Sequence, residues 1–275
     1  MKIIILYVYY DIMLSVIKMK YIFFDIDGTL VATKDQVHYI PESTKQTIRR
    51  LKENGHVVGV ASGRSMAQLR DVVEELELDY VVSDGGNGVM YKGEILHISP
   101  LDKDITLRFA AELLEKKIPF AFMITPHINE VNASSVMLNH KKIFRCEDIG
   151  IVIDDDFDYK KHDAYKIFFS IRQGEEDLVN TIDARKIVRY FDEWLAYECD
   201  DKYKGVKEIV ELDNGNVDDI IFFGDGLNDI PMFEKVKTSI AMGNAVQDLK
   251  EIATFVTKRC DEDGILYACE YLGLI

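Results

Sequence analysis

Apolar runs bounded by polar or glycine-rich turns recur along this chain and predict buried strands of a parallel sheet. Near both ends of the chain these runs alternate with helical patterns, which is typical of a right-handed parallel sheet. In the first part we expect strands at residues 21–24, 57–61 and 80–82, and helices at 41–55 and 66–76. In the last part we expect strands at 220–223, 239–242 and 255–256, and helices at 204–212, 231–235 and from 264. The predicted fold class is therefore α/β, with a Rossmann-like parallel-sheet core.

The middle of the chain has a different pattern. A glycine-rich stretch at residues 83–88 is typical of a hinge or linker. After it we expect a hairpin at 89–98, a helix at 102–117, and strands at 120–124, 165–171, 187–190 and 195–198. This pattern indicates a separate α+β module. We therefore predict a core formed by residues 19–83 and 196–275, with an inserted α+β cap domain at 84–195 that sets substrate specificity.

The first 18 residues do not fit either pattern. Lys2 and the apolar run after it resemble the start of a signal peptide, but Asp11 interrupts the run and no cleavage pattern follows. The run is also too short for a membrane span. We interpret residues 1–18 as an N-terminal extension upstream of a natural start at Met19; the alternative is an extra helix or strand packed on the core.

Composition narrows the class of protein. The 275 residues are 48% hydrophobic and 29% charged, as in ordinary globular proteins. The net charge of −15 argues against a nucleic-acid partner and requires local positive groups for any anionic substrate. The four cysteines form no C-x-x-C pair, which favours reduced thiols in a cytoplasmic protein over a zinc site. We expect no membrane partner, and the sequence does not indicate an oligomeric state.

Four polar clusters follow or begin the core elements, and ligands of open parallel sheets bind beyond the carboxyl ends of the strands. In chain order the clusters are Asp25 with Asp27, Ser62-Gly63, Lys204-Gly205, and Gly224 to Asp229. The first follows the apolar run directly, and Gly28 allows a sharp turn there. The pair of close carboxylates suits nucleophilic attack with proton transfer, metal binding, or both.

Together the clusters have a consistent chemistry. Asp25 can attack phosphorus and form an aspartyl-phosphate, while Asp27 protonates the leaving oxygen and later takes a proton from water. Because a carboxylate and a phosphate repel each other, a divalent cation is needed, and Mg²⁺ bound by Asp25 and Asp225 fits this need.

The remaining polar residues can hold the phosphate. Ser62 and its neighbouring amides can donate hydrogen bonds to phosphate oxygens, and Lys204 at a helix start adds positive charge. Alone, Ser62 could equally be a helix cap and Lys204 a solvated lysine. Asp229 could be an acid at a helix N-terminus or a group that orients the metal ligands. The whole set in this order favours catalysis.

The order of these residues resembles the haloacid dehalogenase (HAD) superfamily, and most closely its Cof-type phosphatases, whose large α+β cap follows the second motif. The resemblance covers Met19 to the C-terminus. The matching motifs are Asp25-Ile26-Asp27-Gly28-Thr29-Leu30, Ser62-Gly63-Arg64, Lys204-Gly205, Gly224 to Asp229, and the subfamily loop Gly243-Asn244-Ala245.

The resemblance implies a backbone Mg²⁺ ligand at Asp27. It also implies phosphate contacts at Ile26 (backbone), Ser62, Gly63, Lys204 and Asn228. The family more often has small or hydroxyl residues just before the third motif, where this chain has Asp200 to Tyr203. Lys202 is therefore a rival for the role of Lys204, although Lys204-Gly205 fits the motif better.

The function predicted is a Mg²⁺-dependent phosphatase acting on small phosphorylated metabolites such as sugar phosphates. The first alternative is a hexose-phosphate mutase, because the resemblance also reaches the phosphomannomutases. The second is a non-catalytic phosphosugar-binding regulator, which would not need both Asp25 and Asp27. Within the cap, the candidates for substrate recognition are His127, Asn129, Arg145 and Tyr165.

Overall fold

The computed structural model describes residues 18–139, 149–182, 187–191 and 193–275. The predicted N-terminal extension, apart from Lys18, and the cap candidate Arg145 lie outside these residues. The described chain forms two compact units: the first contains residues 18–58, 215–229 and 236–275, and the second contains the described residues of 59–214 together with 230–235.

Unit 1 contains four parallel strands in the order β16-β15-β14-β1. Its strands are β1 (Tyr21–Phe24), β2 (Ala32–Lys34), β3 (Val37–Tyr39), β14 (Ile220–Gly224), β15 (Thr238–Ala241) and β16 (Phe255–Val256). Its helices are α2 (Glu42–Glu53), α7 (Gln247–Ile252) and α8 (Gly264–Tyr271), with short 3₁₀ turns at Val217–Asp219 and Leu227–Asp229. The prediction of parallel strands is confirmed here.

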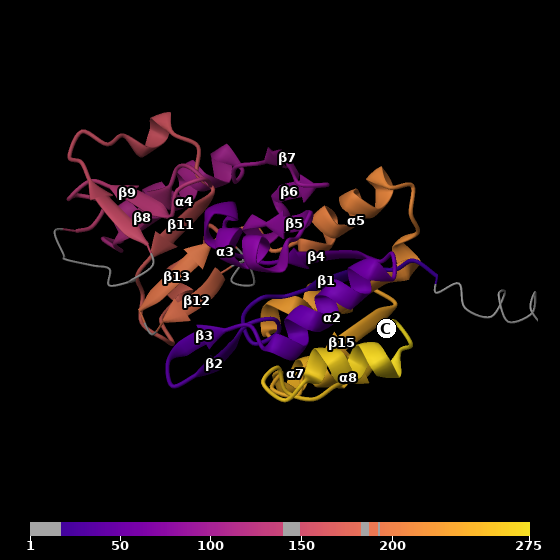
Figure 1. The fold of residues 1–275 in the computed structure, drawn as a ribbon. Coiled ribbons are helices and arrows are strands. Elements are labelled where there is room, and N and C mark those ends of the chain that lie inside the picture. Colours follow the sequence, from indigo (N-terminus) through magenta and orange to yellow (C-terminus); the bar gives the residue numbers. More distant parts are fainter. Residues whose placement is uncertain (1–17, 140–148, 183–186, 192) are drawn as a thin grey trace, which may run out of the picture. The chain divides into compact units, whose positions relative to one another are not determined.

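The central strands of unit 1 are apolar on both faces. All four residues of β1 and all five of β14 are buried, and the rings of Phe24 and Phe223 stack with centroids 4.7 Å apart. Helix α2 buries Ile48 and Leu51, the face that its sequence pattern predicts, and contacts α8 (Figure 1). This packing holds the carboxyl ends of β1 and β14 side by side.

Unit 2 begins within β4 (Val57–Ala61), which starts in unit 1, and continues into two sheet regions. The first region has β5 (Tyr80–Ser83), β6 (Gly88–Tyr91) and β7 (Glu94–Ile98), with helices α3 (Met66–Leu76), α5 (Lys202–Leu212) and α6 (Ile230–Phe233). The second has β8 (Phe120–Met123), β9 (Glu130–Ala133), β10 (Gly150–Ile153), β11 (Lys166–Phe169), β12 (Ile187–Phe191) and β13 (Trp194–Tyr197), with helix α4 (Lys103–Glu115). Short 3₁₀ turns lie at Asp84–Gly86, Tyr159–Lys161 and Glu176–Leu178.

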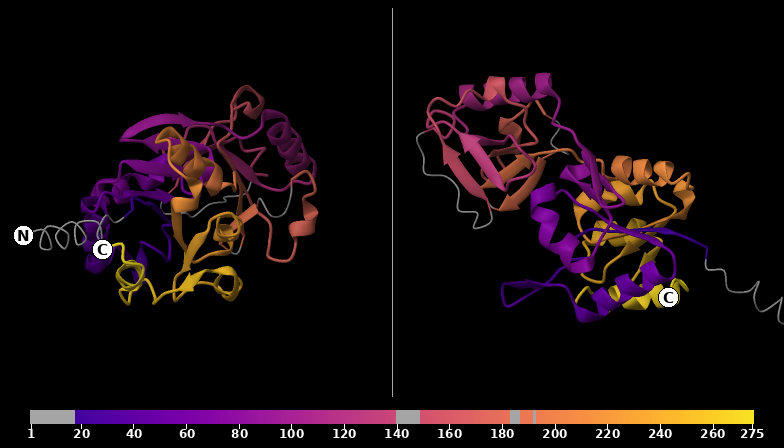
Figure 2. Two further views of the ribbon diagram at one scale, coloured as in Figure 1. Left: turned by 90° about the vertical axis from the view of Figure 1, so that its right-hand side faces the viewer. Right: turned by 45° about the horizontal axis from the view of Figure 1, so that its top comes forward.

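The strands of these two regions belong to different sheets. Strand β4 is parallel to β5, whereas β5, β6 and β7 are antiparallel to one another. The second region is a six-stranded sheet in the order β10-β9-β8-β11-β13-β12. Helix α4 covers one of its faces, and Phe109, Ala110 and Leu113 of that helix are fully buried in the core there (Figure 2).

The six-stranded sheet falls within the cap predicted at residues 84–195, except for the last two residues of β13. The division into compact units follows other boundaries, because it joins residues 59–83 and helix α5 to that sheet. The core and cap boundaries therefore stay a prediction. Among the described residues, no helix is long and apolar enough to cross a membrane.

The glycine-rich stretch expected to be a hinge is a buried turn between β5 and β6. Asp84, Gly85 and Gly86 are all buried, and both glycines have positive φ, +64° and +111°. A Cβ on Gly85 would lie 1.7 Å from the carbonyl oxygen of Cys199, and one on Gly86 would lie 2.1 Å from that of Asp201. Only glycine allows the backbone of residues 199–201 to approach this closely.

We expect Gly85→Ala to lower the free energy of unfolding by about 2 kcal/mol or more, because the new Cβ meets backbone and the residue keeps positive φ. Gly174→Ala is the matched control, since Gly174 has φ +87° but nothing within 4 Å of its Cβ position. That control should lose only about 1 kcal/mol. Urea denaturation measures both; equal losses would contradict the close approach.

Candidate active site

Asp25 and Asp225 occupy equivalent places after two neighbouring parallel strands of unit 1. Strands β1 and β14 pair with Phe24 opposite Phe223, and the Asp25 N–H donates to the Phe223 carbonyl at 2.9 Å. Asp225 follows Gly224, the last residue of β14. The sheet register therefore brings the two carboxylates to the same edge, as the sequence predicts for ligand sites of parallel sheets.

Asp229 joins these two residues in a compact acidic cluster. Carboxylate oxygens of Asp25, Asp225 and Asp229 all lie within 4.8 Å of one another. Asp25 and Asp229 are buried, with 5% and 0% of their surface exposed, and Asp225 is half-buried. Buried like charges at this separation repel one another, and a cation among them would relieve the repulsion. Hard oxygen donors are the ligands that Mg²⁺ and Ca²⁺ prefer, so the cluster fits a divalent cation.

A tight turn after β1 gives Asp225 its place. Gly28 has φ +75°, and a Cβ there would lie 2.1 Å from Oδ2 of Asp225. The Gly28 N–H donates to Val31 O at 2.9 Å, and the Val31 N–H returns to Ile26 O at 2.8 Å. The turn is therefore closed by backbone hydrogen bonds, and glycine at position 28 leaves room for the acidic cluster.

Asp229 also organises the turn after β14. One of its carboxylate oxygens accepts the backbone N–H groups of Asp225 at 3.0 Å and Gly226 at 3.1 Å. A Cβ on Gly224 would come within 2.6 Å of that same oxygen. The carboxylate thus fixes the backbone that carries Asp225, while its role in orienting metal ligands stays a prediction.

Asn244 is a contributor to which the sequence analysis gave no role. Its Nδ2 donates to the Gly28 carbonyl at 2.8 Å and to Oδ2 of Asp225 at 3.3 Å. Its Oδ1 accepts the Cys260 N–H at 3.0 Å. Asn244 therefore bridges the turns after β1 and β14. Its place in a short polar loop after β15 is the sequence feature that could have indicated this role.

Cys260, which follows the bridge, is a protonated thiol. Burial and the charges of Asp261 and Asp225 raise its pKa.

Three other predicted site residues of unit 1 lie beside the cluster in the chain. Asp27 is exposed and its carboxylate is not part of the acidic cluster. Ile26 is fully buried, and Asn228 is exposed within the Leu227–Asp229 turn. The exposure of Asp27 suits exchange of protons with a leaving group or water.

Ser62 and Gly63 form the loop between β4 and α3 in unit 2. Ser62 is 3% exposed, its Oγ accepts the Arg64 N–H at 3.2 Å, and its carbonyl accepts the Gly85 N–H at 3.1 Å. The N-cap of α3 is Ser65, whose N–H donates to Gln68 Oε1 at 3.0 Å. Ser62 is therefore not the cap of the following helix, and the alternative considered for it is wrong.

The two candidate lysines differ in burial. Helix α5 begins at Lys202, two residues earlier than expected, because Asp201 caps it by accepting the Lys204 N–H at 3.3 Å. Lys202 is 3% exposed, whereas Lys204 is exposed. A Cβ on Gly205 would lie 2.5 Å from Val82, so this glycine lets α5 pack against β5.

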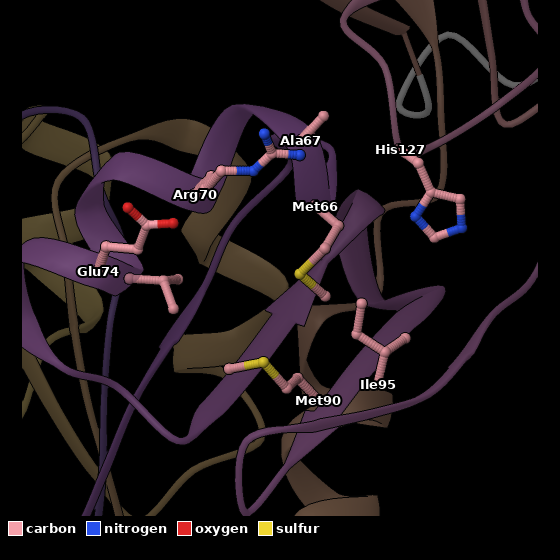
Figure 3. Close-up of a pocket in the computed structure, with 8 residues that line it drawn as sticks. Met66, Ala67, Arg70, Glu74, Met90, Ile95 and His127 are labelled. Carbon is pink, nitrogen blue, oxygen red and sulfur yellow. The ribbon is translucent and has the colours of Figure 1, made fainter.

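A pocket lies elsewhere in unit 2, between α3 and the hairpin β6–β7 (Figure 3). Its lining residues are Met66, Ala67, Arg70, Val73, Glu74, Met90, Ile95 and His127. His127 is one of the predicted cap candidates, and Figure 3 shows it on a loop facing Met66 and Ile95. None of the predicted catalytic or phosphate-binding residues lines this pocket, so we do not assign the active site to it.

Comparison with known proteins agrees with this geometry. Residues 22–269 match the family model of haloacid dehalogenase-like hydrolases. A Bacillus subtilis (strain 168) protein named "Putative phosphatase YkrA" is 35% identical over 93% of this chain and 98% of its own length. The 5-amino-6-(5-phospho-D-ribitylamino)uracil phosphatase YwtE of the same organism is 25% identical over 92% of this chain and 98% of its own.

Solved structures extend the comparison to the fold. A protein from Geobacillus kaustophilus HTA426 has a TM-score of 0.73 and 32% identity, covering 94% of this chain and 100% of that one. The HAD subclass IIB sugar phosphatase BT4131 has a TM-score of 0.74 and 26% identity, with the same coverage. The resemblance drawn from the motifs is confirmed: the chain belongs to the haloacid dehalogenase-like hydrolase family and is a phosphatase of the HAD type.

Proposed function

We propose that this phosphatase is Mg²⁺-dependent and hydrolyses small phosphorylated metabolites, most notably sugar phosphates, through an aspartyl-phosphate on Asp25. The observation that carries the proposal is the buried Asp25 carboxylate within 4.8 Å of Asp225 and Asp229 at the ends of β1 and β14. A carboxylate in this position is a nucleophile held by two strands, and its neighbours gather the negative charge that a cation would neutralise.

The reaction needs two displacements at phosphorus. First, an Asp25 carboxylate oxygen bonds to phosphorus, the ester P–O bond breaks, and Asp27 donates a proton to the departing oxygen. Then Asp27 takes a proton from water, the water oxygen bonds to phosphorus, and the Asp25–phosphorus bond breaks to release inorganic phosphate. Asp27 has the exposure that both proton transfers require.

The metal site would consist of the Asp25 and Asp225 carboxylates with the backbone carbonyl of Asp27. Bound there, Mg²⁺ supplies charge neutralisation between the attacking carboxylate and the phosphoryl group. Asp229 and Asn244 hold the Asp225 backbone and side chain through the hydrogen bonds described above. These two residues fix the geometry of the ligands without a need to coordinate the ion themselves.

Phosphate binding is assigned to Ser62, Gly63, the Ile26 backbone, Asn228 and one lysine at the start of α5. The motif match favours Lys204, and burial favours Lys202, because an ammonium group is removed from water only where an anion compensates it. We propose that Lys202 supplies the charge that binds phosphate and that Lys204 is a solvated neighbour.

The names of two relatives support the proposed substrate class. BT4131 is described as a sugar phosphatase, and YwtE is named for a phosphorylated ribitylamino compound. Both names describe phosphate monoesters on polyhydroxylated carbon chains, so we propose this chemistry for the substrate here.

The cysteines bear on the cellular compartment. Among the described residues, Cys199, Cys260 and Cys269 form no disulfide, which supports the predicted cytoplasmic, reducing compartment.

A screen of phosphate release tests the function directly. We expect Mg²⁺-dependent release from hexose phosphates, pentose phosphates or phosphorylated ribityl compounds, complete loss in EDTA, and recovery with Mg²⁺. Ca²⁺ should inhibit, because its larger and looser coordination shell misplaces the carboxylates. Conversion of one hexose-phosphate isomer into another without release would indicate a mutase, and tight binding without turnover would indicate a regulator.

Asp27→Asn separates proton transfer from metal binding. With poor leaving groups, kcat should fall by about 10²–10⁴-fold, because the general acid and base is lost. With an aryl phosphate the loss should be smaller, and a burst of aryl alcohol should precede a slow phase while Asp25 stays phosphorylated. Mg²⁺ affinity should not change; equal losses for both kinds of substrate, without a burst, would refute the role.

The two lysines form a matched pair of variants. Lys202→Met should lower kcat/KM by about 10²-fold or more, as expected when a charged group stabilising the transferring phosphoryl is removed. Lys204→Met should stay within about threefold of the wild type, since exposed charges contribute little. Far-UV circular dichroism and the melting temperature report on folding in each variant. A larger loss for the Lys204 variant would reverse the assignment.

A further inference from the structure

A buried ion pair in unit 2 takes no part in the proposed chemistry. Lys166 begins β11 and Glu198 follows β13, and these strands are antiparallel neighbours. The Lys166 Nζ lies 2.6 Å from Oε2 of Glu198, with side chains only 1% and 5% exposed. Burying two charges costs more than burying apolar groups of similar volume unless the geometry serves a specific purpose.

The ion pair contacts the loop that carries Ser62. Lys166 Nζ donates to the Gly63 carbonyl at 2.6 Å, and a Cβ on Gly63 would lie 2.6 Å from Oε1 of Glu198. Position 63 therefore has room for glycine only unless Glu198 moves. The contact joins residues about a hundred positions apart in the chain, within a single compact unit.

The Gly63 carbonyl shares its peptide plane with the Arg64 N–H. Because a peptide is rigid, fixing the carbonyl also fixes the direction of the N–H. That N–H donates to Ser62 Oγ at 3.2 Å. A hydroxyl has one donor and two acceptor positions, so once its oxygen accepts from Arg64 the O–H is oriented to donate elsewhere.

Asp84, in the turn after β5, joins Lys166 and Glu198 in a second, buried charged cluster. It is 2% exposed; Ser83 Oγ donates to its Oδ2 at 2.8 Å, and Oδ1 has no hydrogen-bond partner among the described residues. The Asp84 N–H donates to Arg64 O at 2.8 Å, so the same loop is held from a second side. Burial raises the pKa of Asp84 to about 6; Lys166 opposes this increase and Glu198 adds to it.

We propose that Lys166, with Glu198 and Asp84, positions the peptide between Gly63 and Arg64 so that the Ser62 hydroxyl points its hydrogen at the substrate phosphate. The proposal rests on the proposed function, in which Ser62 binds phosphate. Lys166 acts through the Gly63 carbonyl and the Arg64 N–H and touches no substrate, so it is a positioning residue. Glu198 compensates the buried ammonium charge, and Asp84 holds the loop at Arg64.

The test uses the double variant Lys166→Met/Glu198→Gln, which removes both charges of the ion pair together, so neither partner is left buried without the other. The inhibition constant of inorganic phosphate should rise about tenfold, and kcat/KM should fall by about ten- to a hundredfold, because a misplaced binding group costs rate steeply. Lys161→Met is the control; its side chain is 78% exposed and pairs with Asp158 at the surface. We expect no change in either constant there.

A double-mutant cycle with Ser62→Ala distinguishes positioning from general damage. If Lys166 acts through Ser62, the double variant should change the phosphate inhibition constant by less than about twofold in the Ser62→Ala background. Equal effects in both backgrounds, or no effect in the presence of Ser62, would overturn the proposal. A lowered melting temperature with unchanged phosphate binding would show a structural role only and would also overturn it.

Hydrogen exchange provides a readout that does not depend on activity. The amides of residues 62–65 should exchange faster in the double variant and at the wild-type rate in Lys161→Met. If the wild type neither binds phosphate nor turns over, the proposed function fails, and faster exchange still supports the positioning of the loop. Unchanged exchange contradicts the positioning whatever the activity.

The variant Asp84→Asn tests whether Asp84 belongs to the charged cluster with Lys166 and Glu198, through the pH dependence of the melting temperature. The groups facing Asp84 are Lys166, Glu198, Tyr165, the Ser83 hydroxyl and the Met66 N–H. A pKa raised above its ordinary value of 3.8 means that wild-type stability falls as pH rises toward 6. Asparagine tolerates the positive φ of 51° and carries no charge. The melting temperature of the variant relative to wild type should therefore rise between pH 4 and pH 7; a constant difference would exclude Asp84 from the charged cluster.

Discussion

Repulsion between neighbouring carboxylates is the constraint on which the rest of this structure depends. The sheet register places Asp25 and Asp225 at the same edge, and Asp229 is fully buried beside them. Such a group of acids is unfavourable in isolation, so the surrounding chain must hold it in place. Backbone N–H groups compensate Asp229, and Asn244 compensates Asp225. The charge that remains fits a divalent cation, which the proposed mechanism uses to bring the phosphate to this site.

A second constraint acts in unit 2, where backbone segments approach too closely for side chains. Gly85 and Gly86 allow residues 199–201 to lie against the turn after β5, and the Asp201 N–H donates to Gly85 O at 2.8 Å. Gly85 in turn donates to Ser62 O. The turn is therefore bonded both to the loop after β4 and to the start of α5. Within unit 2, the loop that carries Ser62 and Gly63 and the start of α5 share one backbone framework, and the Lys166–Glu198 pair adds side-chain support to it.

Much of this fold could be predicted from the sequence because the deciding signals are local. The bounds of β4 and α3 are the predicted ones, since an apolar run defines the strand and Ser65 with Gln68 forms a capping box. The hairpin β2–β3 was missed, because its strands are three residues long and Val37 and Tyr39 are exposed. The pairing of β9 with β10 was missed too, since parallel pairing between distant segments leaves no local pattern.

In the candidate site, too, the residues with a local sequence signal were predicted and those that depend on distant contacts were not. Asp25, Asp225 and Asp229 follow strand ends directly, so the motifs were sufficient to select them. The bridging role of Asn244 and the Lys166–Glu198 pair depend on contacts between residues far apart in the chain, which no spacing rule reports. The difference between Lys202 and Lys204 depends on where α5 begins, and a shift of two residues decides which side chain is buried.

The central claim is that Asp25 carries the phosphoryl group during turnover. The most direct measurement is rapid acid quenching of the wild-type enzyme with an aryl phosphate and Mg²⁺, followed by peptide mass spectrometry. The account predicts a phosphoryl group on Asp25 that forms within the first turnover and disappears when the substrate is exhausted. Steady turnover with no phosphorylated peptide, or with the phosphoryl group on another residue, would contradict it.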